Sequence, residues 1–390
     1  MDFAMPEEIK MMRGQLRRFV EENLIPQERQ FLLEGRLREE ERRRLQYKLR
    51  DELGLWALGV PEKYGGNAVS VLAQSVATEE LNRSCLMLNP GGFVPEALIE
   101  GATPYIEEHF IIPTVEGKKV PAEAGGFTES GAGSDLQMIQ TKAVRDGDDW
   151  VINGEKIFIS GGDTCDYLHV LTATDKEKRA KGGMTMFVVE RGMPGFTVLR
   201  TIPTMGDDWQ PAHLLFDNVR VPPTHLLGKE GWGFYLGSSQ LAVGRLHIAA
   251  INCGMSGRCL EMALDYSKQR VQFGQPIAER QAIQWMLADS ALELYAGRLM
   301  VYHVSWLADQ NLPIRNEAFY AKLYCTEMAH RVTDRALQIF GGYGYTKDLP
   351  IQSFYRQNRV WRIGHGTSEV HRWMIARNLL KSGLDPQLFE

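Results

Sequence analysis

A chain of 390 residues is longer than one hydrophobic core usually serves, so its length predicts two or three domains. A hydrophobic content of 44% and a charged content of 24% are those of an ordinary folded protein, and a net charge of −5 gives no reason to expect nucleic-acid binding. Without a long apolar run, a signal-peptide pattern or metal-ligand spacing among the five cysteines, we expect a cytoplasmic, metal-free protein with buried thiols.

The first 122 residues are expected to form a helical region. Charges of both signs recur three and four residues apart over 36–52, which favours a helix with an ion-paired, solvated face. A proline and two glycines over 61–66 break this pattern, and a helical pattern resumes over 73–81. The glycine-containing segment 85–101 predicts no clear element.

From residue 123 to about residue 235 the pattern changes to short β-strands. Apolar runs flank Asn153-Gly154, a dipeptide typical of tight turns, so we expect a hairpin there. The other runs rich in β-branched residues predict strands over 167–174, 184–190, 214–216 and 219–223. Together these segments indicate a small β domain.

From residue 236 onward the pattern is helical again. Apolar residues form an approximate stripe from Leu246 to Tyr266. Further helices are expected over 281–308, 317–340 and 370–381. Long helices joined by short links predict an antiparallel bundle.

Three polar or glycine-rich stretches are candidate ligand sites. In Thr128-Glu-Ser-Gly-Ala-Gly-Ser-Asp, two hydroxyls suit a polar ring edge or a phosphate, although such a turn alone is more often structural. Arg270 ends a helix, where it could hold a pyrophosphate or only complement the helix dipole. The Gly366-Thr-Ser turn before the last helix offers an anion cradle, or simply a cap.

These stretches occur in order with Pro61-Glu-Lys-Tyr-Gly-Gly, Asn153-Gly-Glu-Lys-Ile-Phe-Ile-Ser and Gln338-Ile-Phe-Gly-Gly-Tyr-Gly-Tyr. Over nearly the whole chain this set resembles the acyl-CoA dehydrogenase family. The resemblance implies a mainly α fold with a central β domain, namely a helical N-terminal domain over 1–122, a β-barrel over 123–235 and a four-helix bundle over 236–390. It also implies an FAD-dependent oxidoreductase, a flavoprotein of fatty acid metabolism, assembled as a homodimer or homotetramer. Its substrate would be an acyl-CoA or acyl-carrier thioester, and its electrons would pass to an electron-transfer flavoprotein or another acceptor.

The resemblance also assigns roles by position. The residues that would line and hydrogen-bond the flavin ring are Phe127, Thr128, Phe158 and Ser160. Those that would reach the FAD of a neighbouring subunit are Arg270, Gln272 and Phe273, with its adenosine side completed by Gln281, Gln338, Gly341 and Gly342. The FAD phosphates would meet Thr367 and Glu369. The acyl-CoA substrate would contact Ser134, which also lies on the cofactor side, and Arg245 and Gly366.

The chain departs from the family pattern at several positions. Ser130 replaces a proline, and Phe158 and Ser160 replace tryptophan and threonine conservatively. The larger change is Gly364-His365, which replaces an aromatic residue and the glutamate that removes the substrate α-proton. Some members keep this carboxylate just before the arginine that corresponds to Arg245, but here that residue is Gly244.

His365 is therefore the candidate catalytic residue, and three interpretations stay open. A neutral histidine, with an ordinary pKa of about 6.5, could take the α-proton while the β-hydride passes to flavin N5. Alternatively, His365 is a satisfied polar residue pointing away from the flavin, in a homologue that binds flavin without this chemistry. The third interpretation is a flavin monooxygenase or oxidase on the same fold, against which stand the intact Gly-Ala-Gly-Ser-Asp run and Arg245.

Overall fold

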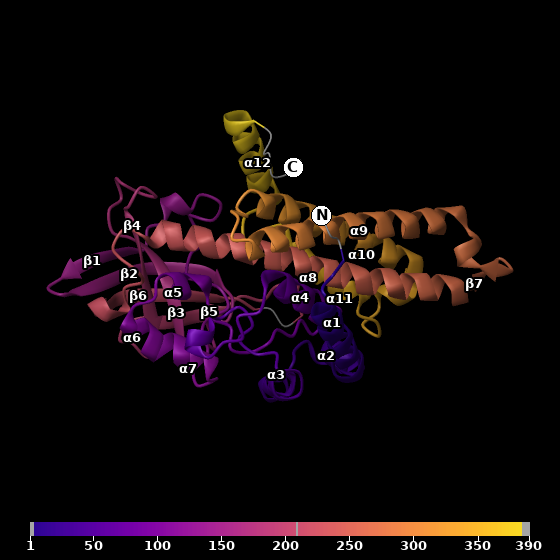
Figure 1. Cartoon of the computed structure of the whole chain (residues 1–390), viewed down its shortest axis with the longest axis horizontal. Helices are drawn as coiled ribbons and strands as arrows, with labels where there is room; N and C mark the ends of the chain where they lie inside the picture. Colours follow the sequence, from indigo (N-terminus) through magenta and orange to yellow (C-terminus); the bar gives the residue numbers. More distant parts are fainter. Residues whose placement is uncertain (1–3, 208–209, 384–390) are drawn as a thin grey trace.

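The computed structural model describes residues 4–207 and 210–383. Helices form the N-terminal and C-terminal parts, and a β-sheet lies between them in sequence. In Figure 1 the sheet occupies one end of the elongated molecule, and the long C-terminal helices extend to the other end. The expected mainly α fold with a central β domain is confirmed.

The N-terminal part is a set of mostly short helices. The predicted ion-paired face is found on α3 (Glu39–Leu53), where Glu39 pairs with Arg43 at 2.9 Å and Glu41 with Arg44 at 2.6 Å. The other helices of this part are α1 (Glu7–Phe19), α2 (Glu28–Glu34), α4 (Val71–Leu81), α5 (Glu96–Glu100), α6 (Pro104–Ile106) and α7 (Ile112–Val115). Of these, α5 lies within the segment for which the sequence predicted no element.

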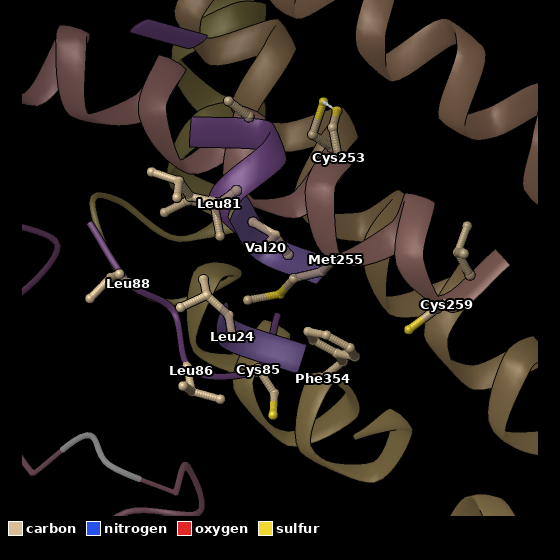
Figure 2. Packing of buried hydrophobic residues seen from close by; sticks show 14 of the residues in the cluster. Val20, Leu24, Leu81, Cys85, Leu86, Leu88, Cys253, Met255, Cys259 and Phe354 are labelled. Carbon is tan, nitrogen blue, oxygen red and sulfur yellow. Dashed lines mark hydrogen bonds between the residues drawn. The ribbon is translucent and has the colours of Figure 1, made fainter. Parts of the chain in front are cut away.

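One hydrophobic core joins the N-terminal helices to the C-terminal ones. Leu24, Leu81, Met255 and Phe354 pack in the same buried cluster although they are far apart in the chain (Figure 2). All five cysteines are free and buried, as the sequence predicts. Burial of apolar side chains from both ends of the chain fixes α4 against the C-terminal helices.

The central part is a six-stranded mixed sheet with the strand order β4-β3-β1-β2-β6-β5. Neighbouring strands are antiparallel except β1 and β3, which pair in parallel. The strands are β1 (Lys142–Asp146), β2 (Asp149–Ile159), β3 (Tyr167–Ala173), β4 (Met184–Glu190), β5 (Phe196–Thr201) and β6 (Ala212–Val221). The two runs predicted over 214–216 and 219–223 belong to one strand, β6.

The hairpin predicted at Asn153-Gly154 is wrong. Both residues lie inside β2, where the pairing with β6 is irregular between Ile152 and Gly154. Gly154 is needed there for packing, because a Cβ at this position would lie 2.6 Å from the Thr141 Cα. An Asn-Gly pair inside a strand, opposite an extra residue of β6, thus imitates the sequence of a tight turn.

The C-terminal part contains the longest helices, and these positions were well predicted. α8 packs along both α9 and α10, while α11 and α12 pack on α10. The helices are α8 (Gly233–Gln269), α9 (Gln281–Asp309), α10 (Glu317–Phe340), α11 (Ile351–Trp361) and α12 (Ser368–Ser382), with a small hairpin, β7 (Val271–Gln272) and β8 (Gln275–Pro276), between α8 and α9. Across the described residues, every helix is too short or too polar to cross a membrane.

Candidate active site

The 364–367 turn, which joins α11 to α12, holds His365. Its backbone is left-handed, with φ of +55° at His365 and +94° at Gly366. Thr367 caps α12, because its Oγ1 accepts a hydrogen bond from the Val370 N–H at 3.2 Å. A non-glycine residue at positive φ is uncommon and needs support from its surroundings.

Three helices supply that support through the carbonyl groups of the turn. Arg245 of α8 donates from Nε to the His365 carbonyl oxygen at 3.3 Å, and the Nε2 of His371 in α12 lies 3.2 Å from the same oxygen. Lys322 of α10 donates from Nζ to the Gly366 carbonyl oxygen at 2.7 Å. The backbone that carries His365 is thus fixed by side chains from α8, α10 and α12.

The imidazole ring of His365 lies against α8 at Gly244. A Cβ at position 244 would stand 3.0 Å from Cδ2 and 3.1 Å from Nε2 of His365. Positions 365 and 244 are therefore in contact. These are the two positions at which the family resemblance leads us to look for a carboxylate. One carries an imidazole, and the other carries no side chain.

The electrostatic surroundings keep this histidine neutral. Burial lowers the pKa of His365 to about 4, and the nearby charges of Lys322 and Arg245, together with His247, act in the same direction. His365 nevertheless keeps some accessible surface. Burial also lowers the pKa of His371, to about 3. Both imidazoles are therefore unprotonated at neutral pH, and the surrounding positive charge opposes their protonation.

The two cations of this cluster have no matching anion in contact. Burial and then Arg245 lower the pKa of Lys322 to about 7, and burial and then Arg315 lower the pKa of Arg245 to about 10. The Arg245 guanidinium lies 4.5 Å from the centre of the Phe319 ring. Within the described chain, neither Lys322 nor Arg245 has a carboxylate hydrogen-bond partner. The turn thus lies in a region of positive charge.

A second turn, the 127–134 turn, lies beside strand β2 in the central sheet. The Thr128 carbonyl accepts a hydrogen bond from the Ile157 N–H at 2.9 Å, and the Phe127 carbonyl accepts one from Lys156 Nζ at 3.0 Å. These bonds bring Phe127 and Thr128 next to Phe158 of the same strand. Ser160 lies two residues further along, and Ser134 is exposed on the turn.

A buried ion pair supports this second turn. Lys156 is fully buried and lies 2.8 Å from a carboxylate oxygen of Glu129. The Glu129 carboxylate also accepts the N–H groups of Gln140 at 2.6 Å and Thr141 at 3.0 Å. Burial lowers the pKa of Lys156 to about 8, opposed by Glu129. Burial favours the neutral acid of Glu129, but Lys156 and the N–H groups hold its pKa below the ordinary value.

Phe158 gives the clearest indication that this region takes a flat ligand. Its side chain is 51% exposed, and its backbone is left-handed with φ of +61°. An exposed phenylalanine in a strained conformation is costly unless something covers it. With the hydroxyls of Thr128 and Ser160 nearby, the residues fit a flat aromatic ring that has hydrogen-bonding edges.

A third group of candidate residues lies at the opposite end of the molecule (Figure 1). Arg270 ends α8, and Gln272 and Phe273 form the β7–β8 hairpin, in which Phe273 is 95% exposed. Stacking of Tyr266 on Phe340, with ring centres 4.2 Å apart, joins this end of α8 to the end of α10. The residues gathered there also include Gln281, Gln338, Gly341 and Gly342.

Thr367 ends the 364–367 turn and caps α12, and Glu369 lies in the first turn of that helix. Glu369 is exposed, and its pKa is lowered by its own backbone N–H and then by Thr367. The Glu369 carboxylate therefore already accepts hydrogen bonds from its own backbone N–H and from Thr367, the donors that an external anion would also use.

The sequence analysis missed four residues around the two turns. Lys156, Lys322 and His371 contact carbonyl groups of the turns, and His247 acts on His365 through its electrostatic surroundings. Lys156 and His371 lie inside stretches singled out for other residues. Lys322 gave a usable signal, since it is a lysine among the buried positions Ala318, Ala321 and Cys325 of α10. His247 gave none.

Comparison with known proteins extends over almost the whole chain. Models of the acyl-CoA dehydrogenase N-terminal, middle and C-terminal domains match residues 6–118, 124–219 and 231–380. The probable acyl-CoA dehydrogenase YngJ of Bacillus subtilis is 36% identical, over 98% of this chain and 100% of the relative. The acryloyl-CoA reductase (NADH) of Anaerotignum propionicum is 34% identical, over 98% and 96%.

The fold comparison agrees with the sequence comparison. The solved structure of butyryl-CoA dehydrogenase from Megasphaera elsdenii superimposes with a TM-score of 0.90 at 34% identity, covering 98% of this chain and 100% of that chain. The same order of helical, sheet and helical parts is thus shared from end to end. This chain belongs to the acyl-CoA dehydrogenase family.

Proposed function

We propose that this protein is an FAD-dependent acyl-CoA dehydrogenase in which His365 takes the place of the family's glutamate base. The observation that carries the proposal is the neutral imidazole of His365 on the fixed backbone of the 364–367 turn, with some accessible surface remaining. A neutral imidazole is a competent general base, and a positioned base is the requirement for removal of an α-proton.

The charges around His365 would help the reaction in a different way. Loss of the α-proton develops negative charge on the thioester, and preorganised cations stabilise such charge in a dry site. Lys322 and Arg245 supply positive charge there, without a carboxylate bonded to either. FAD, when bound, accepts the β-hydride. The same cations disfavour the imidazolium, so uptake of the proton has to be coupled to formation of negative charge.

The residues proposed to hold FAD come from two subunits. Phe127, Thr128, Phe158 and Ser160 would hold the ring, whereas Arg270, Gln272 and Phe273 would serve the neighbouring subunit's FAD. Support comes from the placement of these groups at opposite ends of one chain (Figure 1). Arginine is suited to bind a pyrophosphate with two parallel hydrogen bonds. The contacts of Gln281, Gln338, Gly341 and Gly342 with adenosine, and of Thr367 and Glu369 with the phosphates, belong to the same proposal.

A homodimer or homotetramer follows from this arrangement. An exposed apolar face of α9 offers a surface for a second copy, with the side chains Trp285, Leu292, Tyr295, Leu299 and Trp306. The division into domains at residues 122 and 235, a cytoplasmic location and an electron-transfer flavoprotein as acceptor are also proposed. Ser134, Arg245 and Gly366 are proposed to contact the substrate.

The experiment is an anaerobic screen of acyl-CoA thioesters against the purified yellow protein. We expect at least one thioester to bleach the flavin absorbance. Because one relative is named a reductase, enoyl-CoA thioesters are added to the chemically reduced protein in parallel, and reoxidation would identify the reverse direction. Failure of every thioester in both directions, with a hydroxylated product formed from reduced flavin and oxygen, would reject the proposal in favour of a monooxygenase.

A further inference from the structure

Gly244 has an unusual place within α8. Its backbone is helical, so its conformation does not require glycine, and glycine inside a helix is unfavourable relative to alanine. Other glycines of α8 permit close backbone packing; a Cβ at Gly254, for example, would lie 2.1 Å from the Glu79 carbonyl oxygen. At Gly244, apart from the neighbouring residues and backbone of α8 itself, the described structure has only two heavy atoms within 4 Å of such a Cβ, both in the His365 ring.

The backbone at position 365 has little freedom to retreat from a side chain at position 244. Arg245 and His371 hold the His365 carbonyl, and Lys322 holds the next one. A Cβ contact of 3.0 to 3.1 Å is closer than such atoms normally approach, so the ring would have to rotate or shift. Because the main chain is held from three helices, the displacement would fall on the imidazole.

We propose that Gly244 is a positioning residue for His365, which leaves room on α8 for the imidazole and thereby sets where its nitrogens point. This inference rests on the proposed function for the role of His365 as base, but the contact itself does not. A shift of a few tenths of an ångström would relieve this contact, which is a fraction of the misplacement of about 1 Å that can cost on the order of 10²-fold in rate. The absence of a side chain at position 244 is thus what allows the imidazole at position 365 to take its observed place.

The pH behaviour of His365 reports its position. The groups that face it are Arg245 and His247 from α8, Lys322 from α10 and His371 from α12. A ring pushed away from α8 would lose part of this desolvation and positive charge. Its pKa would then rise from about 4 toward the ordinary value of about 6.5.

The test compares Gly244→Ala with a matched control on the same helix, Gly257→Ala. A Cβ at Gly257 would lie 3.0 Å from Nη2 of Arg298, so it makes an equally close contact with a different side chain. The readout is carbethoxylation of His365 by diethyl pyrocarbonate, followed by peptide mass spectrometry across pH. We expect Gly244→Ala to change the modification rate at least about threefold and to raise its pH midpoint, because a neutral, accessible imidazole is the reactive form. Gly257→Ala should change neither.

Flavin reduction by an active thioester is measured on the same variants. Gly244→Ala should lower the limiting rate by up to about 10-fold with little change in thioester affinity, and should raise the acid limb of the rate. Unchanged modification kinetics of His365 in Gly244→Ala would overturn the inference. Failure of the proposed function is a separate outcome, in which wild type is not reduced by any thioester but the modification assay still reads the contact.

If Gly244→Ala folds poorly, the inference is tested by combining it with His365→Ala. Gly244→Ala should lower the FAD content and melting temperature less in a His365→Ala background than in wild type, because the clashing ring is gone. Equal losses in both backgrounds would show that position 244 acts independently of His365 and would overturn the inference.

Discussion

The 127–134 turn and the 364–367 turn are each held by a buried lysine that donates to a backbone carbonyl. Lys156 donates to Phe127 at 3.0 Å, and Lys322 donates to Gly366 at 2.7 Å. They differ in their counter-charge, since Lys156 also contacts Glu129 and Lys322 has no bonded carboxylate within the described chain. The pKa values of about 8 and about 7 follow this difference.

The 127–134 turn is thus supported by a neutral ion pair, whereas the 364–367 turn is supported by side chains with net positive charge. In the 127–134 turn the charges of Lys156 and Glu129 cancel. Phe127 and Thr128 can therefore contact a ligand without a strong electrostatic field from this pair. In the 364–367 turn, neither Arg245, which is charged at neutral pH, nor Lys322, which is partly charged, has a bonded carboxylate, so their positive charge remains available to a group that becomes negative. The first arrangement suits a rigid binding surface, and the second suits a site at which negative charge develops during a reaction.

The largest expected effect is on the charged turn. His365→Ala should lower the rate of flavin reduction by about 10²-fold to 10⁴-fold, the usual range for loss of a general base, while thioester binding stays within a few-fold. Anaerobic stopped-flow spectroscopy measures both quantities. A variant that reduces its flavin as fast as wild type would remove His365 from the reaction.

The two lysines give a direct test of the difference in counter-charge. Lys156→Met leaves the Glu129 carboxylate buried and uncompensated, which should lower the free energy of unfolding by about 3–5 kcal/mol. Lys322→Met removes a buried cation that has no bonded anion, and should change the free energy by only about 1 kcal/mol. Urea denaturation at a fixed protein concentration measures both, and equal losses would contradict the comparison.

Acid should destabilise the protein through its buried neutral histidines. His169 packs against Phe127 with ring centres 5.6 Å apart, and burial lowers its pKa to about 4. Because the folded pKa lies below the ordinary 6.5, its contribution is fully present above pH 6.5 and is lost as the pH falls toward 4, about 3 kcal/mol in total. His169→Gln should therefore flatten the pH dependence of urea denaturation between pH 7 and pH 5, and an unchanged slope would contradict this.

A further effect is expected at the distant hairpin. Arg270→Ala should weaken FAD binding by about 1.5–3 kcal/mol, the value of a hydrogen bond to a charged group. Lys268→Ala, two residues earlier on α8, is the matched control and should bind FAD as wild type does. Analytical ultracentrifugation should show that FAD release accompanies dissociation of the assembly. A monomer saturated with FAD would contradict the proposed sharing between subunits.

The sequence predicted the long helices well but not the way in which the site is supported. Helix α10 was predicted with its observed ends because its apolar residues recur at helical spacing. Asn153-Gly154 misled, because this dipeptide, typical of a turn, lies inside β2 opposite an extra residue of β6. The roles of Lys322 and Gly244 depend on contacts between α10 or α8 and a turn far along the chain, and local patterns carry no information on such contacts.

The pH dependence of flavin reduction in the wild-type protein tests the central claim most directly. A thioester that bleaches the flavin at pH 7 is mixed anaerobically with the protein from pH 8 down to the lowest pH at which FAD stays bound. If His365 in its charged surroundings is the base, the limiting rate should stay nearly constant down to about pH 5 and fall toward pH 4, as its lowered pKa requires. In His365→Ala this acid limb should be absent at a much lower rate. An identical acid limb in both proteins would contradict the claim.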